Sequence, residues 1–204
     1  MLPRLLRSLA CALVIASFGV PVCGSATTLE TVAFPFTGDD TSVRVRLEES
    51  DGGIVFELTV EEGFGDLRGL FLDIADDALL TALSVQGDDI TAFETGAVVN
   101  LGGGNNLNGG GSPCPCEIGV GFGTPGIGGD DLMTTEFVLT SGIGDLDLSM
   151  FVDQVIGVRV TSVGDFQDRR EGSSKLGSII PVPEPRSAAL VALGLAGLGV
   201  LRRR

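Results

Sequence analysis

The chain has 204 residues, of which 27 are acidic and 13 basic, and its formal net charge is −14. This charge repels nucleic acid phosphates and anionic lipid headgroups, so the composition argues against both as partners. The chain contains no histidine, tryptophan or tyrosine. It therefore lacks the usual base that activates serine and cysteine nucleophiles, and also the flat, polar-edged rings that are typical of sugar-processing clefts. We predict a protein that is not an enzyme.

Residues 1–26 have the pattern of a secretory signal peptide. Arg4 and Arg7 provide a positive start, an apolar stretch follows, and small residues end at Ala26. Cleavage is expected between Ala26 and Thr27, because signal peptidases need small side chains at that place. The alternative is an N-terminal anchor that is retained. The predicted peptide would place the rest of the chain outside the cytoplasm.

For the body of the chain, residues 27–181, we predict a single antiparallel β-sandwich. Short apolar segments alternate with polar residues, turn signals recur roughly every ten residues, and no segment has the pattern of an amphipathic helix. The clearest element is a hairpin around the glycine-rich turn at residues 50–53. Strands are expected at residues 31–36, 43–48, 54–61, 66–75, 79–85, 90–93, 118–122, 134–140 and 155–163.

Four segments carry more specific predictions. Residues 31–36 are expected at a sheet edge, because Pro35 has no N–H to donate to a neighbouring strand. Residues 148–152 are expected to form a short helical turn. Residues 164–177 are predicted to be a polar exit from the body, and residues 178–181 to be a linker to the tail.

The body is strongly acidic, since it has seven basic and 26 acidic residues and a net charge of about −19. We interpret this charge mainly as a means to stay soluble. Several aspartate pairs also fall in expected loops, and oxygen ligands in loops are suited to calcium. Asp130 and Asp131, after a glycine-rich turn, are the preferred pair for such a site, although no segment fits the EF-hand pattern. No other cofactor is expected.

Residues 100–113 are rich in glycine and asparagine and are predicted to form a mobile surface loop. Cys114 and Cys116 follow this loop and are expected to be oxidised outside the cytoplasm. A bridge between residues two apart closes a small, strained ring, which is relatively easy to reduce. An intermolecular crosslink and free thiols are the alternatives. A zinc site is not expected, because the chain has no histidine and because the other two cysteines, Cys11 and Cys23, leave with the predicted signal peptide, so the body has no second cysteine pair.

The tail, residues 182–204, has three parts. It opens with the motif Val182, Pro183, Glu184 and Pro185, continues with the apolar run 187–201, and closes with Arg202, Arg203 and Arg204. A helix over the apolar run would span about 22 Å, less than the roughly 30 Å of a membrane core. The three arginines would hold its end in the cytoplasm. The tail is therefore a marginal membrane segment beside an extended, accessible motif.

These three parts, in this order, resemble the PEP-CTERM sorting signal of Gram-negative bacteria. In that family the signal is read by exosortase, a membrane-embedded cysteine protease or transpeptidase. The resemblance implies a cut near Pro183, Glu184 and Pro185 and transport to the cell surface or an exopolysaccharide matrix. The alternative is an ordinary membrane anchor that is never cleaved. Blocks of the body also resemble uncharacterised exported proteins of this kind, at residues 65–75, 121–131, 156–164 and 172–176.

Together these observations predict an exported, sorted, non-enzymatic protein of the cell surface or the extracellular biofilm matrix. Its expected partners are signal peptidase, an exosortase-like processing enzyme and surface exopolysaccharide. The inner membrane is expected to hold the precursor only transiently. The rival hypothesis is a calcium-dependent binding module for polysaccharide or protein.

Overall fold

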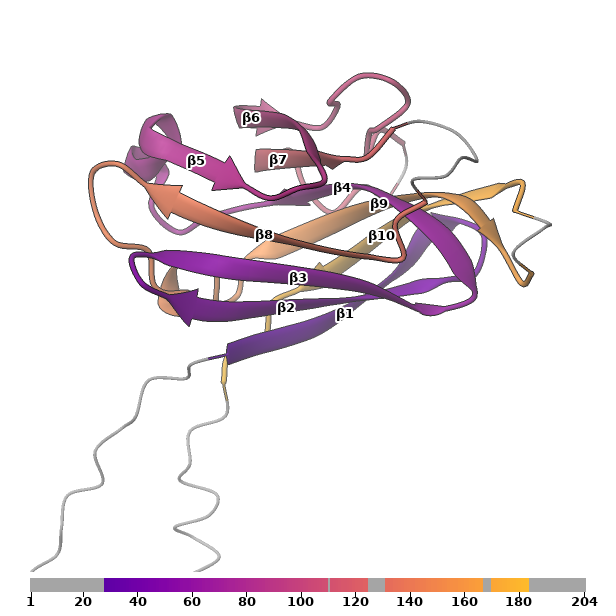
Figure 1. The fold of residues 1–204 in the computed structure, drawn as a ribbon, viewed down its shortest axis with the longest axis horizontal. Helices are drawn as coiled ribbons and strands as arrows, with labels where there is room; N and C mark the ends of the chain where they lie inside the picture. Colours follow the sequence, from indigo (N-terminus) through magenta and orange to yellow (C-terminus); the bar gives the residue numbers. More distant parts are fainter. Residues whose placement is uncertain (1–27, 110, 125–130, 167–169, 184–204) are drawn as a thin grey trace, which may run out of the picture.

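The computed structural model describes residues 28–109, 111–124, 131–166 and 170–183. Within these residues the chain forms ten strands and two short 3-10 helices (Figure 1). The predicted signal peptide, its cleavage site at Ala26 and Thr27, and the tail from Glu184 onward lie outside the described residues. No helix in the described ranges is long and apolar enough to cross a membrane.

The elements in chain order are β1 (Thr28–Gly38), β2 (Ser42–Ser50), β3 (Gly53–Glu62), β4 (Phe64–Leu72), η1 (Asp77–Ala82), β5 (Leu83–Gln86), β6 (Ile90–Val98), β7 (Cys116–Phe122), β8 (Thr134–Ser141), η2 (Leu148–Met150), β9 (Val155–Gly164) and β10 (Gly172–Ile179). The strands pair antiparallel in the order β5-β8-β3-β2-β1-β10-β9-β4-β7-β6. The outer strands β5 and β6 contact each other, so the sheet curls into a nearly closed barrel. The predicted antiparallel all-β body is confirmed.

One continuous sheet, rather than two separate ones, results from the long strand β1. Its first half, from Thr28 to Ala33, pairs with β2, and its second half pairs with β10. The register shifts between Pro35 and Thr37, where a bulge turns the strand. The prediction that residues 31–36 form an edge strand is wrong, because β1 lies between β2 and β10 in the sheet. Pro35 is tolerated because it lies beyond the pairing with β2 and beside the bulge.

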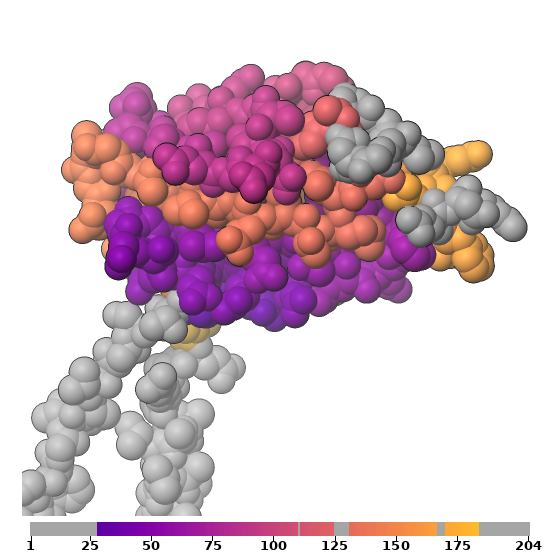
Figure 2. Space-filling model, in the orientation of Figure 1, coloured from indigo at the N-terminus to yellow at the C-terminus, as the bar shows by residue number. Residues whose placement is uncertain are grey.

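A single apolar core fills the barrel, and phenylalanines connect its two sides. The ring of Phe56 on β3 stacks on Phe137 of β8, with centroids 4.9 Å apart, and meets Phe151 edge-on at 5.5 Å. Phe122 of β7, on the opposite side of the barrel, lies 5.8 Å from Phe137. β5 pairs directly with β8, and β6 contacts β5, so the two ends of the sheet meet over this core, and Figure 2 shows a continuous surface there. Both sides of the sheet therefore share one core.

The alternation predicted for the β2–β3 hairpin is confirmed. Its inward residues are all buried: Val43, Val45, Leu47, Ile54, Phe56, Leu58 and Val60. The turn between the strands contains Gly52 with a positive φ of 79°, a conformation that glycine adopts without strain. The local sequence pattern was enough to predict this hairpin, because a two-residue turn fixes the register of the two strands that it connects.

Two predicted elements differ in the structure. Of the predicted strand at residues 79–85, residues 79–82 lie in the helix η1 and residues 83–85 lie in strand β5. The helix begins because the Asp76 side chain accepts a hydrogen bond from the Ala78 N–H at 3.1 Å. The expected polar exit at residues 164–177 and the linker that follows contain β10, which lies between β1 and β9. Pairing on both sides makes this polar segment a strand, and Leu176 is its large inward residue. The helical turn predicted near Leu148 is present as η2.

The described part of the asparagine–glycine loop, residues 100–109 and 111–113, packs against the outer surface of β4 and β9. Leu107 is fully buried there, and Asn105 is only 6% exposed. Glycines in the strands make room for them: a Cβ at Gly69 would lie 2.5 Å from Asn105 Oδ1, and one at Gly157 would collide with Leu107. The prediction of a surface loop is therefore wrong for these two residues, which belong to a second, smaller core.

Two cations also bind the loop to the sheet. Arg159 Nε on β9 donates to the carbonyl oxygen of Gly104 at 3.3 Å. Lys175 Nζ on β10 donates to Asn106 Oδ1 at 3.0 Å. Partial removal from water lowers the pKa of both the Arg159 and the Lys175 side chains. The only lysine of the chain is thus used to attach the loop.

Candidate functional site

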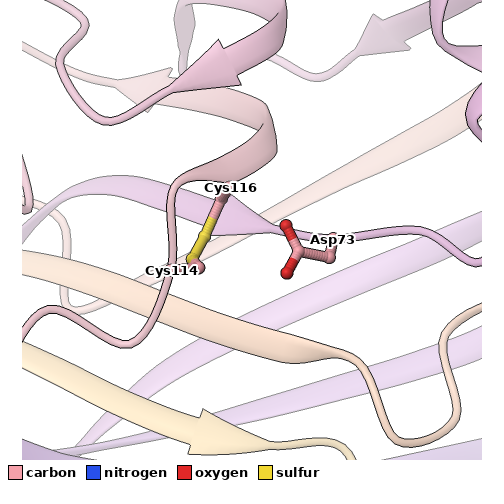
Figure 3. A group of neighbouring side chains, drawn as sticks. All are labelled: Asp73, Cys114 and Cys116. Carbon is pink, nitrogen blue, oxygen red and sulfur yellow. A yellow bond between two sulfur atoms is a disulfide. The ribbon is translucent and has the colours of Figure 1, made fainter.

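The candidate site is the cysteine pair at the end of the asparagine–glycine loop. Cys114 and Cys116 form a disulfide, with their Cα atoms 4.9 Å apart (Figure 3). Cys114 is 6% exposed and Cys116, the first residue of β7, is fully buried. Both pack with Phe71, Val98 and Leu107 in the second core. The pair is therefore enclosed in the protein rather than displayed on a surface loop.

Asp73 lies directly beside this bridge (Figure 3). It follows the last residue of β4, and its Oδ1 accepts a hydrogen bond from the N–H of Glu117 at 3.1 Å. In return, Glu117 Oε2 accepts from the N–H of Ile74 at 3.2 Å. These reciprocal bonds hold the end of β4 against the start of β7. An oxygen of Asp73 and the two sulfur atoms consequently all lie within 4.8 Å of one another.

Sequence reasoning did not single out Asp73 or Glu117, because they lie far apart in the chain and in no common motif. A weak signal exists, since Asp73 interrupts the apolar segment Leu70, Phe71, Leu72 and Ile74. A carboxylate in such a segment needs a hydrogen-bonding partner. The sequence does not say which partner, because only the pairing of β4 with β7 places Glu117 opposite.

Negative charge accumulates around the site. Burial raises the pKa of the Asp73 carboxyl above its ordinary value, and the negative charge of Asp77 raises it further, while the Glu117 N–H lowers it. Burial also raises the pKa of Glu117, with smaller contributions from Asp77 and Asp73 in the same direction. Each neighbouring charge that acts on these two carboxyls is itself a carboxylate. The cluster therefore favours a proton or a cation.

These raised pKa values predict how stability depends on pH. The folded protein holds protons on Asp73 and Glu117 at pH values where the unfolded chain has lost them. The free energy of unfolding should therefore fall as pH rises from the ordinary carboxyl pKa through the raised one. Asp73→Asn keeps an acceptor for the Glu117 N–H but cannot ionise, so we expect a smaller fall. Urea unfolding of both proteins at a series of pH values measures this fall in the free energy of unfolding.

Asp145→Asn, at an exposed position, is the matched control for this series. It should leave the slope of unfolding free energy against pH unchanged. Equal slopes for Asp73→Asn and the unchanged protein would show that Asp73 does not couple folding to pH.

Of the two residues preferred for calcium, Asp131 is described and Asp130 is not. Asp131 forms an ion pair with Arg170, and both side chains are largely shielded from water. A calcium ion at Asp131 would have to compete with this guanidinium. Calcium at Asp130 and Asp131 stays a prediction, and no described contact favours it.

The other loop aspartates that the structure describes in detail fix turns and strand ends. Asp39 Oδ2 accepts from the N–H of Ser173 at 2.8 Å, and so connects the β1–β2 turn to β10. Asp89 Oδ2 accepts from Thr135 Oγ1 at 2.9 Å. Asp76 caps η1. Asp39 and Asp76 thus satisfy backbone N–H groups, and Asp89 a threonine hydroxyl, which is a common role of aspartate in turns.

The two ends of the body lie at one place, which we call the exit pole. Thr31 Oγ1 on β1 lies 2.8 Å from Ser178 Oγ and donates to the carbonyl oxygen of Ile179 at 3.2 Å. Figure 1 shows the start of β1 beside the end of β10. An open hollow at this pole is lined by Leu29, Glu49, Asp147, Leu148, Ser149, Val152, Val182 and Pro183.

Comparison of the chain with protein-family models, with curated proteins and with solved structures finds no match. The chemistry of the site therefore follows from its own residues. A buried disulfide beside a carboxylate can be reduced to two thiols, and thiolates with a carboxylate are ligands for metal ions.

Proposed function

We propose that the protein is exported, trimmed at both ends and delivered to the cell surface or the exopolysaccharide matrix of a Gram-negative bacterium. Its acidic body then acts as a structural or interaction module and not as an enzyme. In this proposal the body is sandwich-like, with β5-β8-β3-β2-β1 facing β10-β9-β4-β7-β6 across the core. Signal peptidase and an exosortase-like enzyme are the processing partners, and Pro183, Glu184 and Pro185 mark the second cut.

The observation that carries the proposal is the position of the two predicted cuts relative to the folded body. β1 begins at Thr28, immediately after the predicted cleavage between Ala26 and Thr27. At the other end β10 ends at Ile179, and the residues from Pro181 to Pro183 are exposed and in no regular structure. Both cuts would therefore spare every described strand, and an enzyme could reach the described residues before the second cut without unfolding the body.

The shared exit pole adds a second argument. Before processing, the signal peptide and the sorting tail would both hold the chain at the membrane. A body whose two ends leave side by side can hang from both attachments without distortion. The charge of about −19 on the body suits neutral polymers, cations or basic proteins as partners at the cell surface.

Intact-mass measurement of the protein from the envelope and the medium of its own host tests this proposal. We expect a mass that begins at Thr27 and ends near Pro183 to Pro185, plus any group attached there. Glu184→Ala should shift the protein toward the uncut form, because it removes the acidic residue of the motif. Glu171→Ala, at an exposed position near β10, should be processed normally. A mass that runs through Arg204 in the unchanged protein would overturn the proposal.

A further inference from the structure

We propose that Asp73, Cys114 and Cys116 bind a thiophilic divalent cation, such as Zn²⁺, once the disulfide has been reduced. Asp73 follows the last residue of β4, Cys114 lies at the end of the asparagine–glycine loop, and Cys116 begins β7. Their donor atoms all lie within 4.8 Å of one another (Figure 3). Two sulfurs and one carboxylate oxygen form a donor set that zinc accepts in proteins. The site goes beyond the proposed delivery to the cell surface and does not depend on it.

This proposal revises the sequence-based exclusion of zinc. That exclusion rested on the lack of histidine and of a second cysteine pair, and it counted only ligands visible as a local motif. The pairing of β4 with β7 supplies a third ligand, Asp73, from a distant part of the chain. Three protein ligands leave a fourth tetrahedral position for water or a small molecule, as in zinc sites that are not closed.

The surroundings of Asp73 are those of a positioned ligand. The Glu117 N–H donates to Asp73 Oδ1, and Glu117 Oε2 accepts from the N–H of Ile74, so the two ligand-bearing segments are fixed to each other. Hydrogen bonds of this kind orient a metal-binding carboxylate and increase its affinity. Reduction would add two potential thiolates to a place that already holds Asp73 and Glu117. A divalent cation would compensate for this accumulated negative charge.

Because the two sulfur atoms are buried, a small ion can reach them more easily than a protein partner can. Cys116 is fully buried, and Phe71, Val98 and Leu107 pack around the pair. A protein thiol would have difficulty reaching these sulfur atoms to form a mixed disulfide. Asp73, in contrast, is only partly buried, so an ion can enter from its side.

The chemistry requires a reductant, for which we name a small dithiol. A thiolate of the dithiol attacks one sulfur, the Cys114–Cys116 bond breaks, and a new disulfide closes within the dithiol. Two electrons and two protons thereby pass to the cysteine pair, which becomes two thiols. Binding of the cation then releases both thiol protons to water and leaves two thiolate ligands.

Cobalt binding tests the proposal, because tetrahedral Co²⁺ thiolate sites absorb in the visible and near ultraviolet. The full chain is used with Cys11→Ser and Cys23→Ser, so that Cys114 and Cys116 are its only thiols. After reduction by a phosphine we expect one Co²⁺ per chain, a sulfur-to-cobalt charge-transfer band, and displacement by Zn²⁺ but not by Ca²⁺. Asp73→Asn should weaken the affinity at least about 10-fold.

The unreduced protein is the first control, since it keeps the fold but has no thiolates, and it should show no charge-transfer band. Asp145→Asn should bind cobalt like the parent. Thermal unfolding of each variant establishes that it is folded. Equal affinity of folded Asp73→Asn and the parent would overturn Asp73 as a ligand. Absence of the band in reduced, folded parent protein would overturn the whole site.

Discussion

Replacing Leu107 by alanine is expected to lower the free energy of unfolding by about 2–5 kcal/mol, although the residue lies in a loop rich in glycine and asparagine. Leu107 is fully buried against the outer surface of β9, and its N–H donates to the carbonyl oxygen of Val99 at 2.9 Å. Gly157 beneath it has no side chain that could fill the cavity. Urea unfolding measured by circular dichroism gives the difference.

Ile143→Ala is the control for this experiment, because Ile143 also lies in a loop but is 67% exposed. It should change the free energy of unfolding by no more than about 0.5 kcal/mol. Leu107→Ala should also speed reduction of the Cys114–Cys116 bridge by a dithiol, since Leu107 covers this pair. If Leu107→Ala were as stable as Ile143→Ala, the loop would not pack on the sheet in solution.

Phe56→Ala is expected to have the largest effect on stability, about 3–5 kcal/mol. Phe56 is fully buried, stacks on Phe137 at 4.9 Å and receives the edge of Phe151 at 5.5 Å. The substitution leaves a cavity at the point where β3, β8 and the segment after η2 meet. Thermal and urea unfolding should both show the loss, with a single transition if the two sides of the barrel share one core.

Phe34→Ala is the matched control, because Phe34 lies on β1 and is 60% exposed. Its removal should have little effect on stability. Two separate transitions in Phe56→Ala would contradict a common core, since the β10-β9-β4-β7-β6 side would then remain folded alone.

The site illustrates what sequence reasoning can and cannot reach. A bridge between Cys114 and Cys116 was expected from the predicted export, but the sequence left an intermolecular crosslink and free thiols as alternatives. Asp73 could not be predicted, because it approaches the pair only through hydrogen bonds between β4 and β7. The same holds for the burial of the pair, which depends on Phe71 of β4 and on the folded loop.

Three features of the body can be predicted from local sequence patterns: its antiparallel all-β class, the β2–β3 hairpin and its acidic character. These features follow from side-chain alternation and short turns, which act between neighbours in the chain. Three other features become visible only in the folded protein: the polar segment Gly172–Ile179 is a strand, β1 joins both sides of the sheet, and the asparagine–glycine loop is packed. Each depends on partners that are distant in the chain, and hydrogen bonding and burial by such partners override weak local preferences.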